Sequence, residues 1–206
     1  MPDFSILLIF IPTWFLVSIS PGLCMSLAMS LGMTIGLKKT LWMMLGELIG
    51  VAIVVVCAVL GVASVILKYP AVFEVAKVIS GAYIIFVGAR TWRTKVEIES
   101  IHITKRSTST SLSLINKGLL TAVLNPKGWA FTVSLLPPFF DLEKPLALQL
   151  SVFLMIILVS ELLCMFLYAS GGRGLRKLLN SNDKAQYINK IGGILLIGVG
   201  LWLAFL

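Results

Sequence analysis

Ser20-Pro21-Gly22 interrupts an apolar stretch that runs from about Phe4 to Ile35. Proline has no amide hydrogen to donate and its ring clashes with the preceding turn, and glycine relaxes the backbone, so these three residues predict a break in an α-helix. Backbone groups freed at membrane depth are tolerated only where protein or a water-filled cavity satisfies them, and transporters build binding sites in this way. The interruption therefore indicates a site inside the first apolar segment.

A second interruption lies in the other half of the chain. Asn125-Pro126-Lys127 falls within another apolar stretch, and Pro126 follows Pro21 by 105 residues, close to half of the 206-residue chain. We therefore predict two halves, each opening with a proline-broken helix, and we expect the two breaks to meet at one central site.

The composition is that of an integral membrane protein. Hydrophobic residues make up 58% of the chain and charged residues only 13%, with a mean hydropathy of +1.01, whereas charged residues make up roughly a quarter of soluble domains. Runs of roughly 20 apolar residues span a bilayer as helices, and the alternating segments of a membrane barrel are absent. We predict an all-α fold, and we interpret the net charge of +8 as topogenic, with no nucleic-acid partner.

Six membrane spans fit the hydropathy. They cover about residues 5–34, 41–66, 71–92, 116–139, 147–170 and 188–206. Residues 1–94 then form a first three-helix half and residues 115–206 a second, joined by residues 95–114, a polar and flexible cytoplasmic linker. The linker carries His102, the only histidine, which we expect to be solvated.

Orientation follows from the basic residues. Three loops hold 13 of the 17 lysine and arginine residues: Lys38 and Lys39; Arg90, Arg93, Lys95, Lys105, Arg106 and Lys117; and Arg173, Arg176, Lys177, Lys184 and Lys190. The positive-inside rule places these loops in the cytoplasm and both termini outside. Since each half has three helices, an odd number, the second half enters from the opposite face, which predicts an inverted repeat.

Small and polar residues form a stripe at each break. The first stripe repeats every four residues and the second has steps of 4, 3 and 4: Ser18, Gly22, Ser26, Ser30 and Thr34; and Thr121, Asn125, Gly128 and Thr132. Side chains at this spacing share one helix face. Helix packing is the alternative explanation, since Gly32-x-x-x-Gly36 and Gly46-x-x-x-Gly50 allow close approach of membrane helices. The same glycine faces permit a homodimer.

Glu47, Lys127 and Glu161 are ionisable residues that fall within the predicted spans. A charge at the bilayer centre costs at least about 2.5–3.5 kcal/mol, so such residues usually face a cavity and pair. Desolvation favours a neutral acid, so an intramembrane glutamate can take up and release a proton. We predict that Glu161, or alternatively Glu47, couples transport to protons. Glu47 lies nearer the cytoplasmic end, where snorkelling or loop capping competes, and Lys127 has the alternative of a structural pairing with either glutamate or with carbonyls freed by Pro126.

The order of these motifs resembles the lysine-exporter and homoserine/threonine-exporter (LysE/RhtB) family. The resemblance rests on Ser20-Pro21-Gly22 followed by spaced glycines and Lys38-Lys39, on the third span from Gly81-Ala82-Tyr83 to Gly88-Ala89-Arg90, and on Lys117-Gly118 through Asn125-Pro126-Lys127 to Leu136-Pro137-Pro138-Phe139. It covers most of residues 1–140, and the last two spans match only in length and hydropathy. It implies a bacterial inner-membrane exporter of amino acids or their derivatives, driven by the proton gradient.

We accordingly predict a secondary active exporter that works by alternating access on a small amino acid, without a cofactor and without enzymatic activity. Its predicted substrate-binding residues surround the two breaks: Ser18, Pro21, Gly22, Ser26, Asn125, Pro126 and Lys127. The amides after Pro21 suit a carboxylate, although Lys127 could take it instead, and the freed carbonyls suit an ammonium group.

Other classes of function are weighed against this one. A metal-ion exporter would need histidine, cysteine or clustered carboxylate ligands that converge in the spans, but His102 lies in the linker and Cys24, Cys57 and Cys164 are scattered singly. A thiol-redox carrier would need cysteines in corresponding helices, but Cys24 falls opposite Trp129 when the halves are shifted by 105 residues. An exporter of another small solute is a further alternative. A non-transporting assembly subunit, held by its glycine faces, would show no substrate-dependent flux.

Overall fold

The computed structural model describes residues 2–20, 22–68, 70–93, 110–141 and 143–179, together with residues 190, 191, 193, 194, 197, 198 and 201. Pro21, residues 95–109 of the predicted linker with His102, and most of the predicted sixth span lie outside these residues. Every regular element within the described ranges is helical, which confirms the all-α class.

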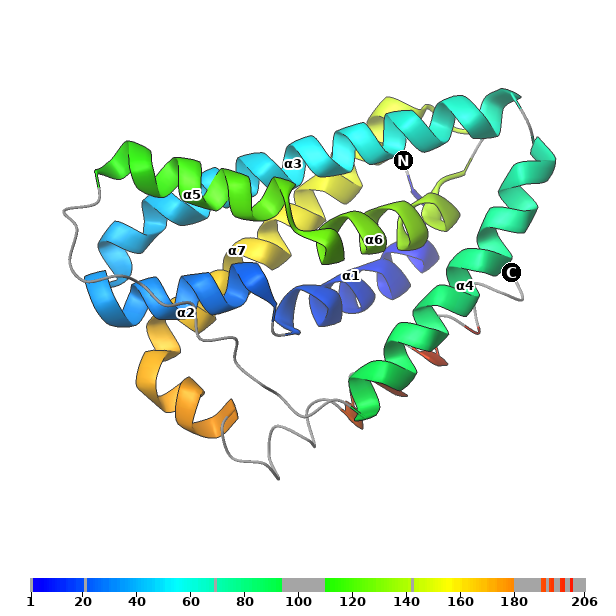
Figure 1. Cartoon of the computed structure of the whole chain (residues 1–206). Helices are drawn as coiled ribbons and strands as arrows, with labels where there is room; N and C mark the ends of the chain where they lie inside the picture. Colours follow the sequence, from blue (N-terminus) through cyan, green and yellow to red (C-terminus); the bar gives the residue numbers. More distant parts are fainter. Residues whose placement is uncertain are drawn as a thin grey trace.

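Seven α-helices and one 3₁₀ helix make up the described part of the chain (Figure 1). They are α1 (Phe4–Ile19), α2 (Leu23–Ile35), α3 (Leu37–Lys68), α4 (Pro70–Arg93), α5 (Ser111–Val123), α6 (Pro126–Leu135), η1 (Pro137–Phe139) and α7 (Leu146–Leu179). Within the described ranges, α3 and α7 are each long and apolar enough to cross a membrane, and α1 with α2 forms a third candidate span that is bent by 58° at its break. The described residues therefore account for two or three of the six predicted spans.

Both predicted breaks are confirmed. At the first, α1 ends at Ile19, the backbone of Ser20 is extended with ψ 131°, and α2 begins again at Leu23. At the second, α5 ends at Val123 and Pro126 occupies the first turn of α6, where a missing amide hydrogen costs nothing because it has no partner within the helix. Figure 1 shows α1 and α2 running from right to left and α5 and α6 from left to right, so the two broken rods are antiparallel.

Helix boundaries differ from the predicted spans at three places. Helix α3 begins at Leu37 and α7 continues to Leu179. Helix α5 begins at Ser111, within the predicted linker, because the Thr110 hydroxyl caps it by accepting a hydrogen bond from the Ser113 amide at 3.3 Å. A threonine cap satisfies one of the free amides of a first turn. The serine-rich composition of residues 107–113 predicted a linker, because the composition alone does not reveal the cap.

Glycines bring α3 and α5 into backbone contact. A methyl group added at Gly46 would overlap the backbone of Ile115, and one added at Gly118 would overlap the Met43 carbonyl and approach the Glu47 amide at 2.7 Å. Small residues allow this close approach between membrane helices. The seam fixes the depth of Glu47, because the backbone of that residue rests on Gly118.

Gly36 has a different role from the packing glycines. Nothing lies within 4 Å of a methyl group added there, but its φ is +83° and its ψ is 160°. This backbone region is open almost only to glycine. The two glycines of the Gly32-x-x-x-Gly36 motif therefore have different roles. Gly32 packs against the Ala169 backbone, and Gly36 is the single residue that connects α2 to α3.

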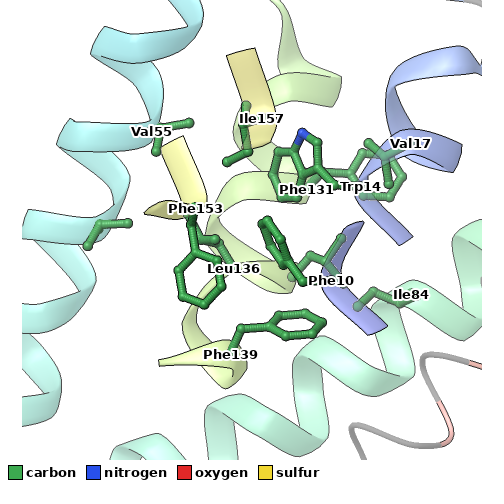
Figure 2. Close-up of a cluster of buried hydrophobic side chains, with 12 residues drawn as sticks. Phe10, Trp14, Val17, Val55, Ile84, Phe131, Leu136, Phe139, Phe153 and Ile157 are labelled. Carbon is green, nitrogen blue, oxygen red and sulfur yellow. The ribbon is translucent and has the colours of Figure 1, made fainter. Parts of the chain in front are cut away.

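Two apolar clusters lie on either side of the breaks. The aromatic cluster joins α1, α3, α4, α6, η1 and α7, and its members are Phe10, Trp14, Val17, Val55, Val59, Ile84, Phe131, Leu135, Leu136, Phe139, Phe153 and Ile157. Figure 2 shows Phe10, Phe139 and Phe153 facing one another, with ring centroids 4.6 Å apart for Phe10 and Phe153 and 5.0 Å apart for Phe10 and Phe139. Such tilted contacts are favourable for aromatic rings.

The second cluster, the methionine cluster, joins α2, the first half of α3, α5 and the second half of α7. Its members are Met25, Leu27, Ala28, Met29, Leu31, Met43, Met44, Leu114, Cys164, Met165, Tyr168 and Ala169. Methionine is unbranched and adapts to irregular gaps. The two clusters therefore differ in stiffness, with rigid rings on one side of the breaks and flexible thioethers on the other.

The outer surface of the helices is strongly apolar. Large side chains are exposed on α1, α3 and α7, among them Phe4 at 75%, Leu60 at 55% and Met155 at 64%. Soluble monomers rarely expose apolar patches on this scale. The exposed faces thus agree with a lipid environment.

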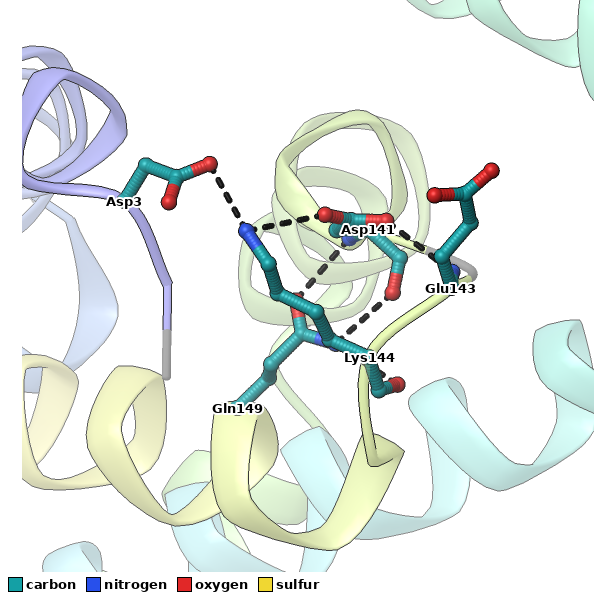
Figure 3. Close-up of polar contacts among 5 residues, drawn as sticks. All are labelled: Asp3, Asp141, Glu143, Lys144 and Gln149. Atoms are coloured by element: carbon teal, nitrogen blue, oxygen red, sulfur yellow. Dashed lines mark hydrogen bonds and ion pairs between the residues drawn. The ribbon is translucent and has the colours of Figure 1, made fainter.

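A polar network ties the start of α1 to the start of α7 (Figure 3). The Lys144 ammonium lies 2.8 Å from Asp3 Oδ2 and 3.0 Å from Asp141 Oδ2. The buried Gln149 amide accepts a hydrogen bond from the Asp141 amide and donates to the Asp141 and Lys144 carbonyls. These bonds hold the η1–α7 connection against the N-terminus.

We expect Gly118→Ala to destabilise the folded protein by about 1–3 kcal/mol, because its methyl group overpacks the seam between α3 and α5. The thermal unfolding midpoint in detergent measures this. Gly61→Ala is the matched control, because nothing lies within 4 Å of a methyl group added at that helical position. Equal midpoints for the two variants would show that the seam is not tightly packed.

The Lys144 network makes a small part of the stability depend on pH. Hydrogen bonding to Lys144 holds the pKa of Asp141 below its ordinary 3.8, and hydrogen bonding to Asp3 and Asp141 raises the pKa of Lys144 above its ordinary 10.5. A lowered carboxyl pKa stabilises the fold above the ordinary value and is lost as the pH falls through the folded value. We expect Lys144→Gln to lower the unfolding midpoint between pH 5 and 9, and the difference from the wild type to shrink below about pH 4.

Candidate functional site

A cavity lies where the two helix breaks meet. Its walls come from α1, α2, α3, α5, α6 and α7, and its lining residues are Trp14, Val17, Ser18, Ser20, Gly22, Cys24, Met25, Glu47, Val51, Val54, Ala122, Asn125, Lys127, Gly128, Phe131, Thr132 and Glu161. It offers about 50 Å³ to the centres of water molecules. One water needs roughly 10–15 Å³ of such space, so this conformation has room for a few waters and no more.

Most of the predicted site residues line this cavity. Ser18, Gly22, Asn125, Lys127, Glu47 and Glu161 do so. Ser26 is buried in α2 but is not part of the lining, and neither is Pro126, which is exposed at the first turn of α6. Pro21 lies outside the described residues. Their roles in binding stay predictions.

The Lys127 ammonium joins the two breaks. Lys127 begins α6, and its Nζ donates to the Val17 carbonyl at 3.1 Å, the Ser20 carbonyl at 3.0 Å and the Ser20 hydroxyl at 2.5 Å. These acceptors lie at the carboxyl end of α1, where carbonyls lose their helical partners and the helix dipole is negative. A cation is therefore well placed there.

This pairing differs from the predicted ones. Lys127 was expected to pair with a glutamate or with carbonyls freed by its own neighbour Pro126, but it reaches across to the carbonyls freed at the other break. On its own side, the Ala122 carbonyl accepts from the Asn125 amide at 3.2 Å and the Val123 carbonyl accepts from the Trp129 indole at 2.8 Å, so Lys127 finds its acceptors at the other break. Since an ammonium has three N–H donors, the Lys127 donors are all used in this conformation.

Glu161 and Ser18 form the second polar contact across the cavity. The Ser18 hydroxyl donates to Glu161 Oε1 at 2.8 Å and so connects α1 to the middle of α7. Glu161 also interacts electrostatically with the Lys127 ammonium. Among the described residues, Glu161 and Lys127 form no direct ion pair, whereas Lys144 pairs with both Asp3 and Asp141.

Glu47 is deeper than the sequence indicated. The alternatives of snorkelling and loop capping are wrong, because its side chain is only 1% exposed and lines the cavity. Neither of its carboxylate oxygens has a hydrogen-bond partner among the described residues. The Cys24 thiol lies beside this carboxylate, but a thiol is only a weak donor. Glu47 is also close enough to Glu161 for the two groups to interact electrostatically.

The helix starts at the two breaks differ in their capping. Asn125 caps α6, since its Oδ1 accepts a hydrogen bond from the Lys127 amide at 3.1 Å. No side chain caps α2, whose N-cap Gly22 lines the cavity. Free amides and a positive dipole end make such a helix start favourable for an anion. The two breaks also contact each other directly through Asn125 Nδ2, 3.6 Å from Cys24 Sγ.

Trp14 and Tyr168 are among the residues of the site that the sequence did not predict. Trp14 lies in the cavity wall. It precedes Ser18 by four residues, so extending the four-residue spacing of the first stripe towards the N-terminus would predict it. Tyr168 donates its hydroxyl to the Ile19 carbonyl at 2.9 Å and so satisfies another group at the end of α1. The signal for Tyr168 is a phenol within an apolar span, because a buried hydroxyl needs a partner.

Comparison with known proteins decides the family. Residues 15–206 match the family described as LysE type translocator. The chain belongs to this family. The resemblance in the breaks and glycines is thereby confirmed, and this LysE type translocator has no match among solved structures.

Relatives of this LysE type translocator include proteins named for efflux. It is 25% identical over 155 residues to the homoserine/homoserine lactone efflux protein of Salmonella typhi, covering 75% of this chain and 74% of that protein. It is 26% identical over 167 residues to the leucine efflux protein of Enterobacter sp. (strain 638), covering 78% and 77%. The uncharacterized membrane protein YrhP of Bacillus subtilis (strain 168) is 28% identical over 203 residues, covering 95% and 96%. The family supports an amino-acid exporter in a membrane.

We expect Lys127→Met to destabilise the folded protein by about 2 kcal/mol, because it removes the ammonium donor from the Ser20 carbonyl and leaves the Val17 carbonyl with the Ser20 hydroxyl alone. The measurement is the unfolding midpoint of the purified protein in detergent or lipid nanodiscs. Lys117→Met, the same change at an exposed position of α5, is the control and should leave the midpoint unchanged. Equal midpoints for the two variants would mean that water replaces the ammonium without cost.

Proposed function

We propose that this chain exports small amino acids or their derivatives by alternating access, coupled to inward proton flow. The observation that carries the proposal is the cavity at the paired helix breaks, because Glu47, Lys127 and Glu161, three ionisable residues of the membrane spans, all line it. Intramembrane charges gathered at a cavity mark substrate and proton pathways. The two relatives named for homoserine/homoserine lactone efflux and leucine efflux support the substrate class.

The proposed architecture is six spans in two inverted halves, residues 1–94 and 115–206, joined by a cytoplasmic linker. It is supported by the opposite direction of the two broken rods in Figure 1. Lys38 and Lys39 are on the first turn of α3 and Lys117 is on α5, and Figure 1 shows both helices beginning at the same end of the bundle. Asp3, Asp141 and Glu143 lie at the other end with Lys144. This asymmetry supports an inner-membrane orientation with periplasmic termini.

Alternating access is proposed from the size of the cavity and from what closes it. A space for a few waters is too small for an amino acid, so a wall must move before substrate enters. The aromatic cluster closes one side and the methionine cluster the other. In the proposed cycle these clusters separate in turn, while Ser18, Gly22, Asn125 and Lys127 stay around the substrate.

Proton coupling is proposed through Glu161. Glu161 accepts a hydrogen bond from Ser18 of α1 and interacts electrostatically with Lys127 of α6. A change in its protonation state would therefore alter the interactions at both breaks. One charge that crosses about 100 mV yields roughly 2.3 kcal/mol, which supports a concentration gradient on the order of 50-fold. One proton per substrate is therefore sufficient for export.

Transport into inverted membrane vesicles tests this function. L-leucine, L-homoserine and a wider amino-acid panel are offered with and without an acidic vesicle interior. We expect the wild type to accumulate at least one of them when the interior is acidic. Glu161→Gln should abolish accumulation and retain exchange of labelled for unlabelled substrate, because exchange needs no net proton movement. Glu143→Gln, an exposed change, is the control.

Two failures are distinguishable in this assay. If the wild type moves no amino acid in any gradient, the transport proposal is wrong. If it moves amino acids equally well with and without the pH gradient, transport stands and proton coupling is wrong.

A further inference from the structure

Three buried polar side-chain atoms in the described residues have no hydrogen-bond partner. They are Trp14 Nε1 and both carboxylate oxygens of Glu47. Buried polar groups are almost always paired, so each exception needs an explanation. All three atoms belong to side chains that line the same cavity, which makes a ligand of that cavity the common explanation.

The unpartnered atoms are chemically complementary to an amino acid. Glu47 offers two carboxyl oxygens as acceptors, and Trp14 offers one N–H donor. A free amino acid has an ammonium group with three donors and a carboxylate with acceptors, separated by one carbon atom. Figure 2 shows the Trp14 indole nitrogen turned away from Phe10, Phe139 and Phe153, so the donor does not point into the aromatic cluster.

The other polar groups of the cavity are already engaged. The carbonyls of Val17 and Ser20, which the sequence favoured for a substrate ammonium, accept hydrogen bonds from Lys127. Glu161 accepts one from Ser18. Among the acidic groups that line the cavity, Glu47 is the one whose two oxygens are both unpaired.

We propose that Glu47 binds the substrate's ammonium group and that the Trp14 indole donates a hydrogen bond to a substrate carboxylate oxygen. The assignment rests on the proposed function. It gives the two glutamates different tasks, with Glu47 for recognition and Glu161 for the proton. The uncapped start of α2 at Gly22 supplies further amides for the same carboxylate.

A carboxylate buried without a partner is costly, so a ligand cation relieves more than it would at an exposed site. The transporter should therefore prefer substrates with a free ammonium group and reject analogues that lack it. A site built around hydrogen bonds to a substrate group rejects the analogue that lacks the group, because its own polar atoms are then left unpaired.

The test uses calorimetry to measure the affinity of the protein in lipid nanodiscs for three ligands that share the isobutyl group of leucine. L-leucine carries both groups, L-2-hydroxyisocaproate has a hydroxyl in place of the ammonium, and isoamylamine lacks the carboxylate. We expect Glu47→Gln to reduce the preference for leucine over the hydroxy acid at least about tenfold. Glu47→Asp should restore part of it. Glu143→Gln, which removes an exposed carboxylate, should leave it unchanged.

The Trp14 half of the proposal has its own comparison. We expect Trp14→Phe to weaken leucine binding at least about tenfold, the value of one hydrogen bond to a charged group, and to leave isoamylamine binding unchanged. Loss of packing alone would weaken both ligands equally. Trp42→Phe, at a tryptophan that is 45% exposed on α3, is the matched control.

The outcomes separate this inference from the proposed function. An unchanged ligand preference in Glu47→Gln, with leucine still bound, would mean that water alone occupies the unpartnered atoms and would overturn the assignment while transport stands. If Glu47→Gln does not fold, Glu47→Asp and the Trp14→Phe comparison decide. If the wild type neither binds nor moves leucine or L-homoserine, the proposed function fails and the inference fails with it.

Discussion

The structure depends on how backbone groups that leave a helix inside an apolar bundle find partners. At the end of α1 the solution comes from the other half of the chain. The Lys127 ammonium at the start of α6 donates to the Val17 and Ser20 carbonyls, and Tyr168 of α7 donates to Ile19. Since buried polar groups cannot be left unpaired at low cost, the two breaks hold each other in place. The two halves thus meet through a chemical necessity and not only through shape.

The four helix ends at the breaks are not treated alike. Asn125 caps the start of α6, the Trp129 indole donates to the Val123 carbonyl at the end of α5, and Lys127 with Tyr168 satisfies carbonyls at the end of α1. The start of α2 has no side-chain cap, and beside it Glu47 and Trp14 have unpaired atoms. The unsatisfied groups are therefore concentrated on one wall, formed by α1, α2 and α3. In a site for a zwitterion, this concentration is the expected arrangement.

The sequence predicted the breaks, the helical class and the gathering of three ionisable residues, because proline, hydropathy and the cost of buried charge act locally. It placed Ser26 at the site, although a helical stripe keeps its face only while the helix is straight, and it missed Trp14 because the stripe was traced through small and polar residues alone. The bend of 58° between α1 and α2 turns Ser26 out of the line that Trp14 and Ser18 share. The depth of Glu47 depends on the start of α3 and on the contact with Gly118, and both arise from tertiary packing.

The single-residue corner at Gly36 has a consequence for how the bundle moves. A backbone with φ +83° cannot be lengthened or slid without leaving a region that suits glycine alone, so α2 keeps its register on α3 and has rotation as its main freedom. Helix α2 has 13 residues, which at 1.5 Å per residue makes a lever of about 20 Å. A rotation of about ten degrees at Gly36 would then move the Leu23 end of α2 by about 3 Å. A displacement of this size is enough to make or break contacts with a bound molecule.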